Sequence, residues 1–315
     1  MKIPGGTRWS EYALIGATIV LAIVFAVVAP GFLSLQNLLN IALSIAVTGV
    51  LAVGMTVVMI TGGIDLGVGS VVALTGVLAA LAIAPAHSAI IAPTVAALAV
   101  GTAVGVINGS LIAYLRVPAF VATLAMLTAA RGLAFLVSGG QSHGDLPDRF
   151  GFIGRSVIFG VPTPVVVMIA VMALGAFLLR RTVFGRHIYA VGGNVEAAWL
   201  AGIDTRRVTW LVYLLDGALV GLGGLMLASR LGAGVPSAGV GYELDVIAAC
   251  VVGGTSLTGG KGTITGTLSG TVFIGVLTNG LNLANVDPYV QKIALGAVIV
   301  LAVIADQIGR FRDAG

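Results

Sequence analysis

The chain has 315 residues, of which 58% are hydrophobic and 9% are charged, and its formal net charge is +4. Soluble globular domains average roughly 45–50% apolar and about 25% charged residues, so the composition excludes an ordinary soluble protein. In a membrane protein basic residues set orientation, so the positive charge does not indicate binding to nucleic acid. The single Cys250 excludes an intrachain disulfide.

Long apolar runs predict membrane-spanning helices. A helix needs ~20 apolar residues to cross a hydrocarbon core of ~30 Å, and the runs are continuous rather than alternating, which favours helices over a β-barrel. We predict ten spans, at residues 12–29, 37–61, 70–84, 90–113, 119–137, 164–179, 208–228, 244–252, 262–283 and 289–305. No linker or charge run divides the chain, so residues 1–315 are predicted to form one all-α, polytopic transmembrane domain.

The distribution of basic residues predicts the orientation of these spans. Ten crossings place both termini on one side, and the positive-inside rule assigns that side to the cytoplasm because eleven Lys and Arg residues gather there against four on the other side. The eleven are Lys2, Arg8, Arg116, Arg180, Arg181, Arg186, Arg206, Arg207, Lys261, Arg310 and Arg312. The four are Arg149, Arg155, Arg230 and Lys292. The long loop at residues 180–207 is therefore predicted to be cytoplasmic.

Glycine pairs spaced four residues apart predict close helix packing, because small residues let membrane helices approach each other. They occur at Gly101/Gly105/Gly109, Gly217/Gly221 and Gly266/Gly270.

Ionisable residues at membrane depth are functional candidates because burying them is costly. Asp65 lies in a stretch with four glycines at residues 61–70, where it is expected either to cap the next helix or to contact a permeating solute. Arg131 has no counter-ion within a helical turn, so it either snorkels to the surface or pairs with another helix. Asp216 is its predicted partner.

Three asparagines within the predicted spans, Asn108, Asn279 and Asn282, offer hydrogen-bond donors and acceptors without the cost of a charge. With Asp65 they are predicted to line a translocation pathway for a hydroxylated solute. Hydrogen bonding between helices is the alternative role for each of them.

The cytoplasmic loop contains a short predicted helix. Asn194 is expected to cap its N-terminus, Glu196 suits the first turn, and Gly202 is expected to end it. About two turns are too few to be stable alone in water, so this helix must pack against a partner or against its own spans. Its alanines, Ala197, Ala198 and Ala201, predict a face of small side chains suited to a groove.

No motif indicates catalysis or a cofactor. Gly259-Gly260-Lys261 lacks the glycine at position 255 and the Ser or Thr at position 262 that a phosphate-binding loop requires. The three histidines are scattered over predicted loops, and no cluster of metal ligands is present in the sequence. We therefore expect no enzyme, no metal and no cofactor.

Several motifs resemble one family. Glu196-Ala197-Ala198-x-x-x-Gly202 resembles the cytoplasmic motif of ABC importer permeases, and residues 184–194 are similar to those of the ribose/xylose-type monosaccharide permeases. Residues 61–70, 116–132 and 241–257 resemble the same family in order.

This resemblance implies the architecture of an ABC importer permease in a bacterial-type inner membrane, importing a pentose or a hexose. It also implies a second permease copy or homologue, a cytoplasmic ABC ATPase and an external sugar-binding protein as partners, besides membrane lipid. The resemblance further implies that the segment coupling the permease to the ATPase consists of Asn194, Val195, Glu196, Ala197, Ala198, Trp199 and Gly202. Docking of the binding protein is expected at Asp145, Asp148, Arg149, Arg155, Arg230 and Glu243.

Two residues depart from the family pattern: Trp199 stands where a basic residue is expected, and Asp216 where a small or neutral one is expected. Because of Trp199, the resemblance does not define the exact contact with the ATPase. Asp216 is expected to alter the solute preference. An ion-coupled secondary transporter, with Asp65 and Asp216 as ion carriers, is the first alternative. An intramembrane enzyme is the second, although the sequence offers no nucleophile or metal constellation for it.

Overall fold

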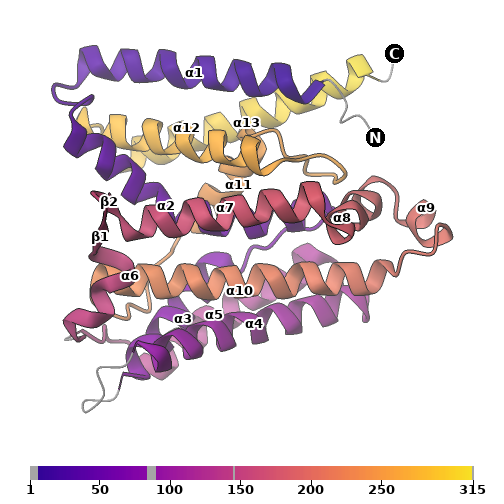
Figure 1. Ribbon diagram of the computed structural model, residues 1–315, viewed down its shortest axis with the longest axis horizontal. Coiled ribbons are helices and arrows are strands. Elements are labelled where there is room, and N and C mark those ends of the chain that lie inside the picture. Colours follow the sequence, from indigo (N-terminus) through magenta and orange to yellow (C-terminus); the bar gives the residue numbers. More distant parts are fainter. Residues whose placement is uncertain (1–5, 84–89, 145, 314–315) are drawn as a thin grey trace.

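The computed structural model describes residues 6–83, 90–144 and 146–313, and most of them lie in helices (Figure 1). In chain order the helices are α1 (Gly6–Val28), α2 (Leu35–Ile60), α3 (Val68–Leu81), α4 (Ile91–Ala113), α5 (Ala119–Ser138), the 3-10 helix η1 (Asp148–Gly151), α6 (Phe152–Arg155), α7 (Thr163–Arg181), α8 (Val183–Gly193), α9 (Val195–Leu200), α10 (Thr205–Leu231), α11 (Tyr242–Val252), α12 (Ile264–Leu283) and α13 (Pro288–Asp313). Strands β1 (Val157–Ile158) and β2 (Val161–Pro162) form a small antiparallel hairpin before α7.

Each predicted span coincides with one helix, and η1, α6, α8 and the hairpin are additional elements that the sequence analysis did not predict. Among the described residues six helices are long and apolar enough to cross a membrane, namely α2, α4, α5, α7, α10 and α12. The helices α3 and α11 have 14 and 11 residues, which gives lengths of only ~21 and ~17 Å against the ~30 Å of a bilayer core. The fold is therefore polytopic and helical, and the number of ten crossings remains a prediction.

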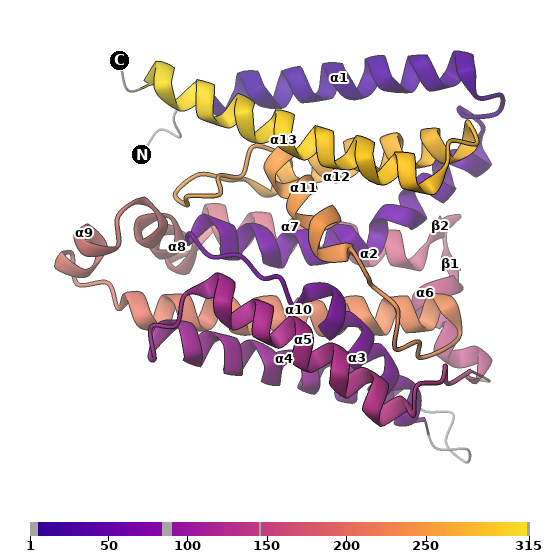
Figure 2. The same cartoon turned by 180° about the vertical axis from the view of Figure 1, so that it is seen from behind.

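The helices run side by side along the long axis of the molecule (Figures 1 and 2). Helices α1, α12 and α13 lie on one side and α3, α4 and α5 on the other, with α2, α7 and α10 between them. Helices α8 and α9 project at one end, which we call the α9 end, and α6 with the hairpin lies at the opposite end. Helix α1 begins and α13 ends at the α9 end (Figures 1 and 2). The start of α1 and the end of α13 therefore lie on the same side of the bundle as the loop that contains the short helix.

The core forms where α10 packs against α2, α3 and α4. Tyr213 of α10 and Met55 of α2 are among its largest fully buried side chains. Both helices are apolar around most of their circumference, as expected of helices surrounded by other helices.

The predicted glycine seams pack against each other. A Cβ atom on Gly101 of α4 would lie 2.7 Å from the Cα of Gly221 of α10, and one on Gly217 would lie 2.8 Å from the Cα of Gly105. Gly270 of α12 similarly faces α11, where an added Cβ would lie 2.8 Å from the amide nitrogen of Gly253. These glycines allow the backbones to approach within contact distance.

Two irregular segments interrupt the helical bundle, one at residues 61–67 between α2 and α3, and one at residues 253–263 between α11 and α12. They approach each other closely, since a Cβ atom on Gly259 would lie 3.1 Å from the amide nitrogen of Gly62. The amide of Gly260 also donates a 2.9 Å hydrogen bond to the carbonyl of Ile60 at the end of α2. Helix α8 contacts the second segment, because the hydroxyl of Tyr189 donates to the carbonyl of Gly262 over 2.6 Å. Non-helical backbone inside a membrane domain is tolerated where protein covers it, and it often marks a solute path.

Candidate coupling and translocation site

The short helix predicted in the loop at residues 180–207 is confirmed as α9. The side chain of Asn194 accepts a 2.9 Å hydrogen bond from the amide of Ala197, as an N-cap does. Gly202 follows the helix with a φ of +83°, a conformation that glycine adopts without strain. The two ends of this helix are therefore defined by the capping residues that the sequence predicted.

Of the three alanines predicted to form a face of small side chains, Ala197 and Ala201 are exposed, whereas Ala198 packs against the protein and is 4% exposed. Larger apolar side chains are exposed beside them. Val195, Trp199 and Leu200 are exposed by 53%, 67% and 77%. We call these three exposed apolar side chains the exposed apolar patch of α9, and Glu196 of the same helix is exposed as well. Figure 1 shows that α9 lies at one extreme of the molecule.

Helix α8, which precedes α9, was not predicted. Its N-cap is Thr182, whose hydroxyl accepts a 3.0 Å hydrogen bond from the amide of Gly185. Thr182 is thus the local signal that sequence reasoning missed. Near its other end Gly192 leaves no room for a side chain, since an added Cβ would lie 2.7 Å from the amide nitrogen of Gly260. Helix α8 therefore links α9 to the irregular segment at residues 253–263 and to the end of α2 at Ile60.

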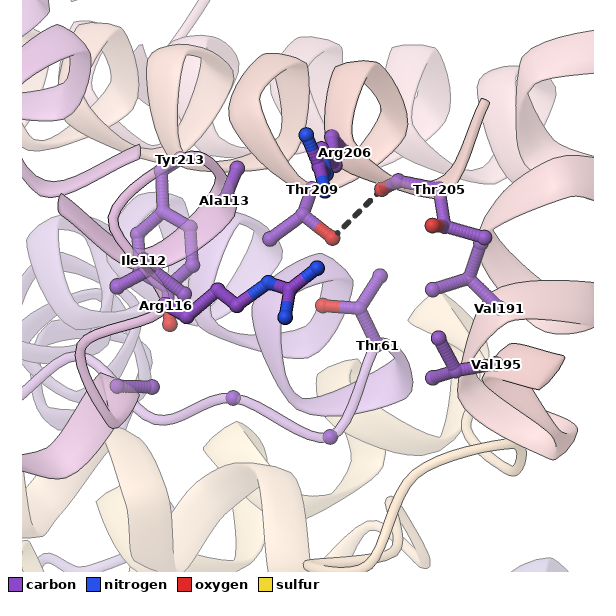
Figure 3. Close-up of a pocket in the computed structure, with 13 residues that line it drawn as sticks. Thr61, Ile112, Ala113, Arg116, Val191, Val195, Thr205, Arg206, Thr209 and Tyr213 are labelled. Atoms are coloured by element: carbon purple, nitrogen blue, oxygen red, sulfur yellow. Dashed lines mark hydrogen bonds between the residues drawn. The ribbon is translucent and has the colours of Figure 1, made fainter. Parts of the chain in front are cut away.

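A cavity of about 400 Å³ opens beside α9. It is lined by Thr61, Gly62, Gly63, Ile112, Ala113, Arg116, Ala119, Val191, Val195, Thr205, Arg206, Thr209 and Tyr213. Figure 3 shows the side chain of Arg116 reaching into it, toward Thr61 and Thr209. Arg116 has a φ of 58°, which is uncommon outside glycine and often marks functional sites. The cavity joins α9 to the interruption between α2 and α3.

Behind the Tyr213 wall of this cavity lies a buried acidic pair. Asp65 and Asp216 are 4% and 1% exposed, and their carboxyl groups lie within hydrogen-bonding reach of each other. Asp65 also accepts a 2.6 Å hydrogen bond from the amide of Gly67, the N-cap residue of α3. Asp65 therefore stabilises the turn before α3 by bonding to Gly67, but it is not itself the N-cap of α3.

The predicted pairing of Arg131 with Asp216 is wrong. The guanidinium of Arg131 donates two 2.8 Å hydrogen bonds, to the carbonyls of Pro236 and Ala238, and its electrostatic partner is Glu243. Asp216 instead faces Asp65 and the phenol of Tyr213. The carbonyls of Pro236 and Ala238 lie within hydrogen-bond distance of the guanidinium, and the spacing of residues along a helix does not indicate which loop carbonyls it meets.

The four predicted pathway residues are not brought together. Asn108 is fully buried in α4, and neither polar atom of its side chain has a hydrogen-bond partner among the described residues. Asn279 of α12 exchanges two hydrogen bonds with Asn37 of α2, of 2.9 and 3.1 Å. Asn282 is exposed. Asp65 and Asn108 lie on the side of the bundle that holds the cavity, whereas the other two lie on α12.

The residues predicted to dock the binding protein lie mostly at the end opposite α9. Asp148, Arg149 and Arg155 are exposed on η1 and α6, and Arg230 lies in the last turn of α10. Glu243 is only partly exposed, because it lies against Gly69 in the first turn of α3. Asp145 lies outside the described residues.

The sequence matches a known protein family and several characterised permeases over most of its length. Residues 37–303 match the family model described as "Branched-chain amino acid transport system / permease component". The chain is 44% identical to the ribose import permease protein RbsC of Escherichia coli (strain K12), over 94% of this chain and 93% of the relative. It is 40% identical to the L-arabinose ABC transporter permease protein AraH of Azospirillum brasilense, over 97% and 91%, and 42% identical to RbsC of Bacillus subtilis (strain 168), over 91% and 90%.

No solved structure matches the chain. The family match covers most of the sequence, and the relatives named above align over nearly their whole length. In such transporters ATPase activity belongs to partner subunits and the permease is not an enzyme. The chain therefore belongs to the family of ABC-type sugar import permeases.

Proposed function

We propose that this chain is the permease subunit that carries a monosaccharide, a pentose or a hexose, across a bacterial-type inner membrane. A separate cytoplasmic ATPase drives it, and a sugar-binding protein outside delivers the solute. The names of the ribose and arabinose permeases support the solute class. A second permease copy or homologue completes the membrane part, with lipid around it.

The exposed apolar patch of α9 is the observation that carries this proposal. Val195, Trp199 and Leu200 would be costly to leave in water, and a helix of 6 residues needs a partner for stability. A groove on the ATPase is the proposed partner. Helix α8 is proposed to transmit the movement of α9, because Tyr189 bonds to Gly262 and Gly192 packs against Gly260 and the end of α2 at Ile60.

The cavity is proposed as the cytoplasmic part of the solute path. Its volume of about 400 Å³ is within the range of ~300–1,000 Å³ typical of small-molecule sites. Its hydroxyl groups on Thr61, Thr205 and Thr209 suit a polyhydroxylated solute, and the ring of Tyr213 offers an apolar surface. Asp65 and Asn108 are buried near this part of the proposed path but do not line the cavity.

The opposite end is proposed to receive the binding protein. Asp148, Arg149 and Arg155 on η1 and α6, together with Arg230, present both signs of charge there. Complementary charges on a binding protein would steer its docking.

Purification from the membrane tests the partners: the chain is captured and the associated ATPase and binding protein are identified. The complex is then placed in lipid vesicles, and ATP hydrolysis is measured with a panel of pentoses and hexoses. Glu196→Lys is expected to stay in the membrane but lose sugar-stimulated hydrolysis. The matched control is Asp287→Lys, at an exposed carboxylate just before α13.

Wild-type stimulation in Glu196→Lys would refute the coupling role of α9. Sugar accumulation by the chain alone under an ion gradient would instead support the secondary transporter, which the family does not favour.

A further inference from the structure

The acidic pair of Asp65 and Asp216 poses a hydrogen-bonding problem that the transport path does not explain. Neither carboxyl oxygen of Asp216 meets a hydrogen-bond donor among the described residues. The neighbouring polar group is the carboxyl of Asp65, which as a carboxylate can only accept. Two ionised carboxylates in contact inside a membrane domain would repel each other and lack solvation.

Among the described residues, no Lys, Arg or His side chain acts on either carboxyl group of the pair. Helices α2, α3 and α4, which pack along α10, contain no Asp, Glu, Lys, Arg or His residue. From α10 itself the phenol of Tyr213 interacts with both carboxyl groups. From α11 the thiol of Cys250 interacts electrostatically with Asp216 and contacts the hydroxyl of Thr56 and the carbonyl of Ala52. Arg131, on the neighbouring α5, is held by Pro236 and Ala238.

The packing also leaves little space for a hydrated ion. A Cβ atom on Gly54 of α2 would lie 3.2 Å from the Cα of Asp216, and one on Gly63 would lie 3.3 Å from Cζ of Tyr213. No group of three His, Cys, Asp or Glu side chains that could hold a metal ion occurs in the described part of the chain.

We propose that Asp65 and Asp216 form a proton-binding site, in which one resident proton is shared between the two carboxyl groups. The protonated carboxyl donates to the ionised one, so each member of the pair gains a partner. The hydrogen bond ties the interruption between α2 and α3 to the middle of α10, directly behind the Tyr213 wall of the cavity. The proton is a structural ligand of this junction, and its presence does not depend on which sugar is carried.

Infrared spectroscopy tests the proposal directly. The purified permease in lipid nanodiscs, in mildly alkaline buffer, is expected to show the carbonyl stretching band of a protonated carboxylic acid, which an ionised carboxylate lacks. The variants are Asp216→Asn and Asp65→Asn, whose amide N–H can donate to the remaining carboxylate without a proton. Both are expected to lose the band, and Asp287→Asn, at an exposed carboxylate, is expected to keep it.

Absence of the band in the wild-type protein, or its persistence in both Asn variants, would overturn the proposal. The spectra are repeated with sodium chloride and with choline chloride. A band that disappears only in sodium would also overturn it, because the pair would then be a sodium site. If Asp65→Asn disturbs folding, as size-exclusion chromatography would reveal, Asp216→Asn alone decides, since its near-isosteric amide keeps the packing against Gly54.

Discussion

A methyl group on Gly217 of α10 would lie 2.8 Å from the Cα of Gly105 of α4. The carbonyl oxygen of Gly101 lies closer still to the same position. The two backbones therefore touch directly, and their close contact places α10 and its Asp216 against the rest of the core.

Gly217→Ala is expected to destabilise the protein, because the added methyl group must push against backbone rather than a flexible side chain. Overpacking of this kind costs about 1–3 kcal/mol. The measurement is thermal unfolding of the purified permease in detergent. Gly132→Ala on α5 is the control, because nothing lies within 4 Å of the position of its added Cβ. Equal stability of the two variants would show that the seam between α4 and α10 is looser than described.

Trp199→Ala is expected to weaken binding of the ATPase without changing the fold. Trp199 is the largest side chain of the exposed patch on α9, and removing a buried interface tryptophan typically costs about 2 kcal/mol or more, which is roughly thirtyfold in affinity. The measurement is the dissociation constant of the permease and its co-purified ATPase in nanodiscs.

The control for Trp199 is Phe159→Ala, at the tip of the hairpin, where the ring is fully exposed at the opposite end of the molecule. Its affinity for the ATPase is expected to match that of the wild-type protein. If Trp199→Ala also binds like the wild-type protein, the exposed patch is not the docking surface.

The sequence predicted those features that depend on neighbouring residues in the chain. Apolar runs predicted the positions of the long helices. Asn194 and Gly202 predicted both ends of α9, because a capping residue contacts residues only a few positions away in the chain. Glycine spacing predicted close packing, but it did not show that the seam of α4 meets that of α10.

Contacts between distant segments were not predictable in the same way. Helices that are apolar all round have no polar face to show which side meets which neighbour. Asp216 therefore gave no indication that it faces Asp65, and the carbonyls that hold Arg131 lie in a loop without a distinctive pattern. The resemblance to sugar permeases was recognised from motifs, and the comparisons confirm it.

Asn37 and Asn279 should behave as an interacting pair. Asn279→Leu leaves the amide of Asn37 without this partner, and such interhelical bonds contribute about 0.6 kcal/mol, with a maximum of ~1.7 kcal/mol. Adding Asn37→Leu removes the unsatisfied amide and should restore part of the stability. Restoration is partial because Asn37 also donates a 2.8 Å hydrogen bond to the carbonyl of Phe32.

Unfolding in a denaturing detergent measures the stability of the single and double variants, and sugar uptake by the reconstituted complex measures function. Lower stability with retained uptake assigns Asn279 to helix packing. Retained stability with lost uptake would assign it to the solute path.

Arg131 and Asp216 are expected to contribute independently to stability, in contrast to the charge pair that the sequence suggested. Arg131→Met leaves the carbonyls of Pro236 and Ala238 without this donor, and because both hydrogen bonds are only partly buried the expected cost is below the about 1–3 kcal/mol of a fully buried unsatisfied group. Asp216→Asn changes a different set of contacts, so the effects of the double variant should add to within about 0.3–0.5 kcal/mol. A coupling well above that range would mean that the guanidinium reaches the carboxylate. Asp65→Asn combined with Asp216→Asn is the positive control, because those two side chains touch and their effects should not add.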